Sequence, residues 1–218
     1  MQSATHNEQL LSFYHRQELA NGITHGFGML FGIIAIPVLM ALAASGGNVA
    51  GLVGVGIYGF SFLMVFTAST IYHSVHQPNI KRVLNIIDHI SIYFLIAGTY
   101  TPFILTGMLD ATGIALLSTL WGIAFLGVIF KIFFIGRFNI VSTLLYVAMG
   151  WALLFVAKPF FASLSTSSLV LVVTGGLLYT IGVIFYLWER LPYNHAIWHI
   201  FVLSAGICHY CAILLKLV

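Results

Sequence analysis

Long apolar segments separated by short polar breaks make up nearly the whole chain. A membrane-spanning helix needs about 20 mainly apolar residues. Seven segments reach this length: 23–44, 50–73, 86–107, 113–134, 139–158, 167–188 and 196–217. The breaks between them are polar or contain glycine, as at residues 45–48 and 191–194. This pattern predicts an all-α integral membrane protein, a single seven-transmembrane helix bundle over residues 1–218 that begins with a short polar segment, 1–22.

The composition supports a membrane protein and excludes other classes. The 218 residues are 61% hydrophobic and 6% charged, with a mean hydropathy of +1.06, whereas a soluble domain is usually about 25% charged. The first apolar run follows a polar segment and precedes six more runs, so we expect it to remain as a span and not to be a cleaved signal peptide. No basic cluster exceeds Lys81-Arg82, so we expect membrane lipids and not nucleic acid as partners.

The basic residues predict the orientation of the bundle. Cytoplasmic loops carry an excess of Lys and Arg. When the loops are assigned alternately to the two sides, the side of the N-terminus holds Arg16, Lys81, Arg82, Lys131, Arg137 and Arg190, and the other side holds Lys158 and Lys216. We therefore expect the N-terminus in the cytoplasm and the C-terminus outside.

Five polar residues share one depth in the predicted bundle. The second span ends with Ser69 and His73, the third begins near Asp88, and the seventh begins with His195 and His199. The second span ends in the cytoplasmic leaflet, and the third and seventh start there. Ionisable residues inside spans are rare and mark functional sites. We therefore expect these five residues to form one site.

The spacing of the histidines predicts a metal site. His195 and His199 are four residues apart, which places them on one face of a helix and is a common way for two imidazoles to bind one metal ion. Together with His73 they leave one coordination position open, as in catalytic zinc sites. Imidazole ligands favour zinc over magnesium or calcium. Asp88 is expected either to be a base beside the metal or to accept a hydrogen bond from the metal-bound water. The alternative is that these histidines only anchor helix ends.

Other polar residues point less clearly to a function. Glu18 and His25 flank the first span, and the sequence leaves open whether they join the rim of the site. On a helix His89 points about 100° away from the residue before it, so we expect it to be orientational or exposed. We expect His76 to be solvated in a loop, and His209 to make a hydrogen-bonded contact between helices.

Three motifs of small or sulfur-containing residues are better explained by packing. Cys208 and Cys211 form C-x-x-C inside a span, without the soluble context of a redox or metal site. Residues 54–59 spell G-x-G-x-x-G, but they lie in an apolar span with no preceding strand, so we expect close helix packing and no dinucleotide. Gly28 and Gly32 predict a helix contact, either within the bundle or at the face of a homo-oligomer.

Four motifs carry a family resemblance that covers essentially the whole chain. They are ELANGITHG at 18–26, ASTIYH at 68–73, DH at 88–89 followed by AGTYTP at 97–102, and PYNHAIWH at 192–199. With these motifs the sequence resembles the hemolysin III family, the bacterial branch of the progestin and adiponectin receptor (PAQR) or CREST superfamily. The resemblance implies a multi-pass protein of the bacterial inner (plasma) membrane.

The resemblance also implies a site and an activity. A zinc ion near the inner leaflet would be held by His73, His195 and His199, with Ser69 and Asp88 close to its bound water. Alkaline ceramidases belong to the wider superfamily, so the expected activity is zinc-dependent intramembrane hydrolysis of a lipid amide, with Asp88 as proton acceptor and Ser69 orienting the water or the oxyanion.

Other functions remain open. The main alternative is a non-enzymatic receptor or regulator of membrane homeostasis in which zinc is a structural clamp. A transporter is less favoured because the outer leaflet has few ionisable residues, and a cytolysin is less favoured because the sequence shows no amphipathic pore-forming segment.

Overall fold

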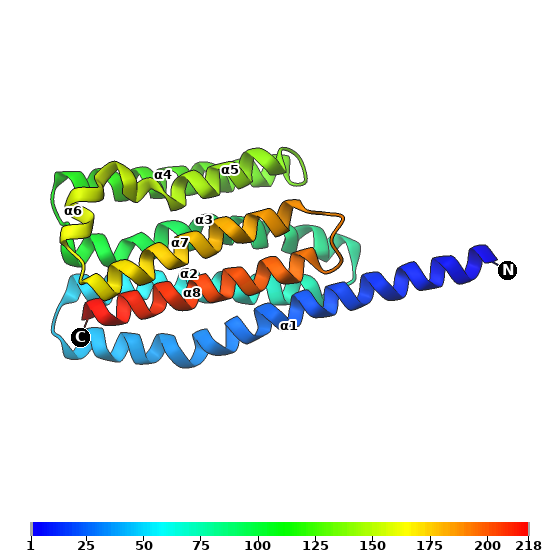
Figure 1. Cartoon of the computed structure of the whole chain (residues 1–218), viewed down its shortest axis with the longest axis horizontal. Helices are drawn as coiled ribbons and strands as arrows, with labels where there is room; N and C mark the ends of the chain where they lie inside the picture. The colour runs from blue at the N-terminus through cyan, green and yellow to red at the C-terminus, as the bar shows by residue number, and fades with distance from the viewer. Residues whose placement is uncertain (1, 218) are drawn as a thin grey trace.

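The computed structural model of the protein describes residues 2–217, with side chains from Leu11 onward. Figure 1 shows helices lying lengthwise beside one another. The elements are α1 (Gln2–Ser45), α2 (Val49–Ser74), α3 (Pro78–Gly107), α4 (Ala111–Phe134), α5 (Asn139–Gly150), the 3-10 helix η1 (Ala152–Val156), α6 (Ala157–Ala162), α7 (Thr166–Leu187) and α8 (Asn194–Leu217). Residues 2–217 contain no strand and provide seven helical stretches long and apolar enough to span a membrane, with α5, η1 and α6 counted together. The predicted fold class is confirmed.

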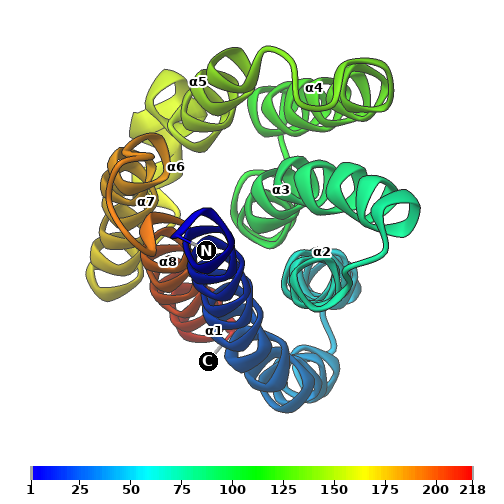
Figure 2. The same cartoon turned by 90° about the vertical axis from the view of Figure 1, so that its right-hand side faces the viewer.

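The first and last spans meet, and α3 takes the central position. Seen along the bundle, the helices follow one another in a ring, and α8 returns to lie beside α1 (Figure 2). α3 packs against α2, α4, α5 and α8. The two ends of the chain lie at opposite ends of the bundle (Figure 1), as an odd number of spans requires. We call the end that carries the N-terminus the N-terminal end; the charge pattern predicts that it faces the cytoplasm.

The first helix is longer than the pattern predicts. The polar segment 1–22 and the span 23–44 were expected to be distinct, but α1 runs without a break from Gln2 to Ser45 and extends beyond the bundle at the N-terminal end (Figure 1). The only proline within α1 is Pro37, so no proline separates the polar part from the apolar part. The polar half of α1 thereby reaches the mouth of the bundle.

The fifth span is interrupted, which the sequence did not predict. α5 ends at Gly150, and the chain continues through η1 into α6. The Tyr100 side chain of α3 enters this break: its hydroxyl donates to the Gly150 carbonyl at 2.7 Å and accepts from the Leu153 amide at 3.1 Å. Insertion of a side chain into the backbone ladder is a recognised cause of a helix break. The hydroxyl thereby gives hydrogen-bond partners to the Gly150 carbonyl and the Leu153 amide, which surrounding lipid could not provide.

Glycines allow the first three helices to approach closely. A Cβ at Gly54 would lie 2.7 Å from the Cα of Pro102 on α3. Gly28 lies directly against the Phe66 ring of α2, and a Cβ at Gly32 would lie 2.8 Å from Leu63. The glycine motif of α2 therefore serves helix packing, as predicted, and the glycine pair of α1 packs within the bundle.

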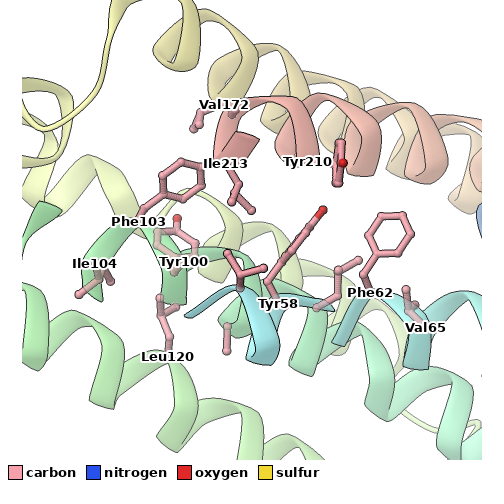
Figure 3. Close-up of a cluster of buried hydrophobic side chains, with 14 of the residues drawn as sticks. Tyr58, Phe62, Val65, Tyr100, Phe103, Ile104, Leu120, Val172, Tyr210 and Ile213 are labelled. Carbon is pink, nitrogen blue, oxygen red and sulfur yellow. The ribbon is translucent and has the colours of Figure 1, made fainter. Parts of the chain in front are cut away.

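The apolar core, part of which is drawn in Figure 3, consists mainly of residues in the half of the bundle away from the N-terminal end. Tyr58 and Phe62 of α2 are fully buried there beside Tyr210 of α8. The tyrosine hydroxyls are bonded across helices: Tyr58 donates to the Gly206 carbonyl at 3.4 Å, and Tyr210 donates to the Ala35 carbonyl at 3.1 Å. The polar site lies at the other end.

Candidate metal centre

Three histidines from α2 and α8 converge at the N-terminal end of the bundle. One ring nitrogen from each of His73, His195 and His199 lies within 4.8 Å of those of the other two. The ring centroids are 5.3 Å apart for His73 and His195, 5.1 Å for His73 and His199, and 4.5 Å for His195 and His199. The three histidines predicted from the sequence are therefore brought together, although more than a hundred positions separate His73 from the other two.

The start of α8 is fixed by its own sequence. Tyr193 adopts a left-handed conformation with φ of 58°, which turns the chain back toward the bundle after α7. Asn194, the first residue of α8, donates through its side-chain amide to the Phe185 carbonyl at 3.3 Å. This bond ties the first turn of α8 to the last turn of α7, so that His195 and His199 face inward at a defined height.

The imidazole of His73 is oriented by α1. Its Nδ1 lies 3.4 Å from Oε2 of Glu18 and 3.5 Å from Nδ2 of Asn21. Lys81 of α3 donates to the same Glu18 oxygen and holds the carboxylate in place. A carboxylate only accepts, so the bond to Glu18 requires the proton on Nδ1; the Asn21 amide nitrogen, which only donates, then makes no hydrogen bond to Nδ1, and Nε2 keeps its lone pair. That Nε2 is buried and has no partner among the described residues.

The imidazole of His199 is oriented in the same way. Its Nδ1 donates to the backbone carbonyl of Asn21 at 3.2 Å and lies 3.4 Å from Oγ1 of Thr24. Because a carbonyl only accepts, Nε2 of His199 again carries the lone pair. The His25 ring stacks on His199 with centroids 3.5 Å apart. Hydrogen bonds to acceptors on α1 therefore leave Nε2 as the free nitrogen in two of the three histidines. Such bonds are usual for metal-binding histidines.

This donor set fits a divalent metal ion. A tetrahedral zinc with imidazole ligands separates the nitrogens by about 3.4 Å, so no pair here would need to close by more than about 1.4 Å. The orphaned Nε2 of His73 would gain a partner. Three neutral imidazoles also suit zinc better than a hard cation. A buried histidine cluster that can bind a metal is therefore present at the predicted place.

Asp88 and Ser69 lie beside the cluster in different surroundings. Asp88 lines the cavity described below, and Ser69 lies one turn before His73 on α2. Ser69 is 0% exposed, and its Oγ has no hydrogen-bond partner among the described residues. Asp88 is therefore open to a ligand, whereas Ser69 is enclosed.

A cavity of about 660 Å³ opens onto all three histidines. Its mouth includes Tyr14 and Glu189, and it continues past the cluster along α3, α5, α7 and α8 as far as His209. His209 follows His199 by ten residues on α8, which corresponds to about 15 Å along the helix. Aliphatic side chains such as Leu95 line the cavity between these points. The cavity therefore joins a polar centre to an elongated space inside the membrane-spanning part of the protein.

The predictions for the remaining polar residues are only partly confirmed by the structure. Glu18 and His25 are buried parts of the site and not merely its rim. His76 is exposed, and the His209 Nε2 lies 3.2 Å from the Val172 carbonyl of α7, both as predicted. His89 was expected to be orientational or exposed, and the second alternative is wrong: it is half-buried, lines the cavity, and has a buried Nδ1 without a partner among the described residues.

Sequence reasoning missed two residues that touch the histidines. Asn21 contacts both His73 and His199, and Thr24 contacts His199. Both belong to the motif at 18–26. A usable signal was present, because Glu18, Asn21 and His25 are spaced at i, i+3 and i+7 and therefore share one face of α1.

Comparison with known proteins identifies the family. Residues 13–210 match the family model described as Haemolysin-III related. The chain belongs to this family.

Its relatives in the family include two proteins from bacilli. The chain is 44% identical to Hemolysin-3 of Bacillus cereus over 191 residues, which is 88% of this chain and 87% of the relative. It is 45% identical to the Hemolysin-3 homolog of Bacillus subtilis (strain 168) over 194 residues, 89% of this chain and 91% of the relative. With seven apolar helices, these relatives make the chain a multi-pass protein of the plasma membrane.

A more distant relative supports the wider superfamily. The chain is 28% identical to the monocyte to macrophage differentiation factor of Homo sapiens over 203 residues, 90% of this chain and 83% of the relative. No solved structure matches the chain. The resemblance inferred from the four motifs is therefore confirmed at the level of the family.

Proposed function

We propose that this haemolysin-III related protein is a zinc-dependent intramembrane hydrolase that cleaves a lipid amide. The observation that carries the proposal is the opening of the cavity onto all three histidines. A closed structural site would surround its metal with protein ligands, whereas three ligands beside an accessible space are typical of catalytic zinc.

The residues around the histidines would hold the metal and set its surroundings. His73, His195 and His199 would be the ligands. When bound in such a site, zinc acts as a Lewis acid and lowers the pKa of water to about 7. Glu18 and the Asn21 carbonyl would keep the Nδ1 protons of His73 and His199 in place, so that both imidazoles present Nε2.

Asp88 would handle the proton of the reaction. Glu18 and Asp88 both line the cavity, but Glu18 is engaged by Lys81 and His73, whereas Asp88 forms no salt bridge with the described residues. In the proposed reaction a water oxygen attacks the amide carbon, Asp88 accepts a proton from that water, and the same proton passes to the nitrogen as the C–N bond breaks. The products are a fatty acid and an amine. The Ser69 hydroxyl, which is enclosed and does not line the cavity, would act only by orienting Asp88.

The cavity supports a substrate with a long apolar chain. It extends about 15 Å beyond the histidines and lies among membrane-spanning helices. A lipid could place its amide at the centre and its acyl chain along α3, α5 and α8. Purified protein in mixed micelles with a long-chain N-acyl amide is the appropriate system.

The test compares turnover in three proteins. The parent should release fatty acid, His199→Ala should lose zinc and activity together, and His76→Ala should retain both, because His76 is an exposed histidine away from the cavity. Unchanged turnover in a zinc-free His199→Ala protein would refute the mechanism.

A structural clamp is the second candidate, and one observation favours it. The histidines come from α2 and α8 and are bonded to α1, so a metal there would tie three helices at one end. In that case, chelation should lower the melting temperature while no lipid-amide turnover is found at any metal loading. A cytolytic activity, which the names of two relatives suggest for those proteins, is less favoured for this chain, as is transport.

A further inference from the structure

Two unpaired polar side chains line the cavity at its far end, away from the three histidines. Nδ1 of His209 on α8 and the hydroxyl of Tyr179 on α7 have no hydrogen-bond partner among the described residues. The two rings are neighbours, with centroids 5.6 Å apart, and both residues line the cavity. A polar group in an apolar environment without a hydrogen bond is costly. The proposed hydrolysis uses neither side chain, so the pair points to a further group of a ligand.

The hydrogen bond that His209 makes to α7 decides what its free nitrogen can bind. Nε2 lies 3.2 Å from the Val172 carbonyl, and a carbonyl only accepts, so Nε2 carries the proton and Nδ1 keeps the lone pair. A Cβ at Gly175 would lie 2.5 Å from both Nε2 and Cδ2, so this edge of the ring rests against α7. Nδ1 is on the other side of the ring and can only accept.

Other polar side chains at this end of the cavity already have partners. The Trp151 indole donates to Oγ1 of Thr180 at 2.9 Å, and Thr99 donates to the Leu95 carbonyl at 2.7 Å. Tyr100 is bonded at the break in the fifth span, as described above. His209 and Tyr179 therefore differ from these neighbours in offering a free acceptor and a free hydroxyl.

There is room for a small polar group beside His209. A side chamber of about 30 Å³ shares His209, Thr99 and Trp151 with the main cavity as lining residues. One water molecule needs about 10–15 Å³, and a hydroxyl group is no larger. A chain that follows the cavity from the histidines along its aliphatic wall therefore reaches a space where its end can carry a hydroxyl.

We propose that His209 and Tyr179 form a subsite for a hydroxyl group on the acyl chain of the substrate, about 15 Å from the histidines along α8. A hydroxyl donates to Nδ1 of His209 and accepts from the Tyr179 hydroxyl, so it gives both a partner. A carboxylate or a carbonyl has no hydrogen for Nδ1. No Lys or Arg is among the described residues that line the cavity, which also disfavours an anion.

This inference rests on the proposed function in placing the amide of the lipid at the histidines. It adds that the preferred substrate is a long-chain amide with a hydroxyl at or near the end of its acyl chain. The subsite itself only binds, so it can be tested by affinity without any turnover.

The test compares the affinities of three amides for the full-length protein in detergent, measured from the rise in melting temperature with ligand concentration. The probes are dodecanamide, ω-hydroxydodecanamide and an isomer of the latter with its hydroxyl in the middle of the chain. The parent should bind ω-hydroxydodecanamide about tenfold more tightly than dodecanamide, the effect of two added hydrogen bonds. The isomer should bind no better than dodecanamide, because its hydroxyl would lie beside aliphatic side chains such as Leu95. Its composition matches that of the ω-hydroxy probe, so it controls for partitioning into detergent.

Two tyrosine variants assign the preference to the subsite. Tyr179→Phe removes only the hydroxyl and should lower the preference for the ω-hydroxy probe to about threefold. Without ligand it should melt at the parent's temperature or above, because the hydroxyl that it removes has no partner among the described residues. Tyr186→Phe is the matched control: it removes a hydroxyl from the same helix and the same cavity, but beside His195, and should keep the full preference.

The outcomes separate the subsite from the hydrolase. Equal affinity of the parent for dodecanamide and ω-hydroxydodecanamide would overturn the subsite and leave His209 and Tyr179 to bound water. An undiminished preference in Tyr179→Phe would overturn the assignment to this pair. Both results would leave the hydrolase standing, whereas a clear preference for the ω-hydroxy probe without any turnover would refute the hydrolase and keep the subsite.

Discussion

The Glu18 carboxylate should strengthen metal binding without being a ligand. Its Oε2 lies 3.4 Å from Nδ1 of His73, and Lys81 donates to the same oxygen. Glu18→Gln keeps the size of the side chain but removes its charge, so the Nδ1 proton of His73 loses a charged acceptor and the imidazole becomes a weaker ligand.

The expected magnitude follows from the geometry. Removing a group that orients a ligand histidine typically costs 10–100-fold in metal affinity. A distance of 3.4 Å is long for a charge-assisted hydrogen bond, so we expect the lower end, about tenfold, or about 1.4 kcal/mol.

The assay is zinc competition against a chelator of known affinity, performed on detergent-purified protein. Glu189→Gln is the control, because Glu189 is an exposed carboxylate at the mouth of the same cavity. Zinc affinity should fall in Glu18→Gln and stay unchanged in Glu189→Gln. Equal zinc affinity for the parent and a folded Glu18→Gln protein would refute the argument that α1 orients His73. An equal fall in affinity in both variants would show that the loss comes from removing negative charge in general and not from the contact with His73.

Three further predictions test the fold and the proposed chemistry. Tyr100→Phe should lower the free energy of unfolding by about 1–3 kcal/mol, since it leaves buried backbone groups at the break in the fifth span unpaired; an unchanged melting temperature would contradict this. Gly54→Ala should destabilise by about 1–3 kcal/mol because its Cβ meets the Pro102 backbone, whereas Gly122→Ala, which meets no atom within 4 Å, should be neutral or stabilising in the same thermal melt. Asp88→Asn should keep zinc but lower lipid-amide turnover by about 10²–10⁴-fold, and wild-type turnover would exclude Asp88 as the proton acceptor.

The number of spans and the meeting of the histidines could be predicted because they depend on robust signals. Apolar length defines a span almost by itself. Once the spans alternate in direction, His73 at the end of one and His195 at the start of another must lie at the same depth. The i, i+4 spacing of His195 and His199 then sets their common face.

Other features depend on side chains that meet only in the folded bundle. The break after Gly150 is filled by Tyr100, fifty residues earlier, and the local sequence of the fifth span gives no sign of this partner. The burial of His89 follows from α5 packing against α3, so the turn angle from Asp88 could not reveal it. From the sequence, Lys131 counts as one of the basic residues on the N-terminal side that predict the orientation. In the structure it lies on the face of α4 against α3 and is buried.

The most direct test of the central claim is the metal content of the purified protein beside the His195→Ala/His199→Ala double variant. About one zinc per chain in the parent and none in a folded double variant is the result that the converging imidazoles predict. A folded parent that retains no zinc when purified without chelators, and takes none up when zinc is supplied, would contradict the metal centre. The histidines, Glu18 and Asn21 would then form only a hydrogen-bonded contact between α1, α2 and α8.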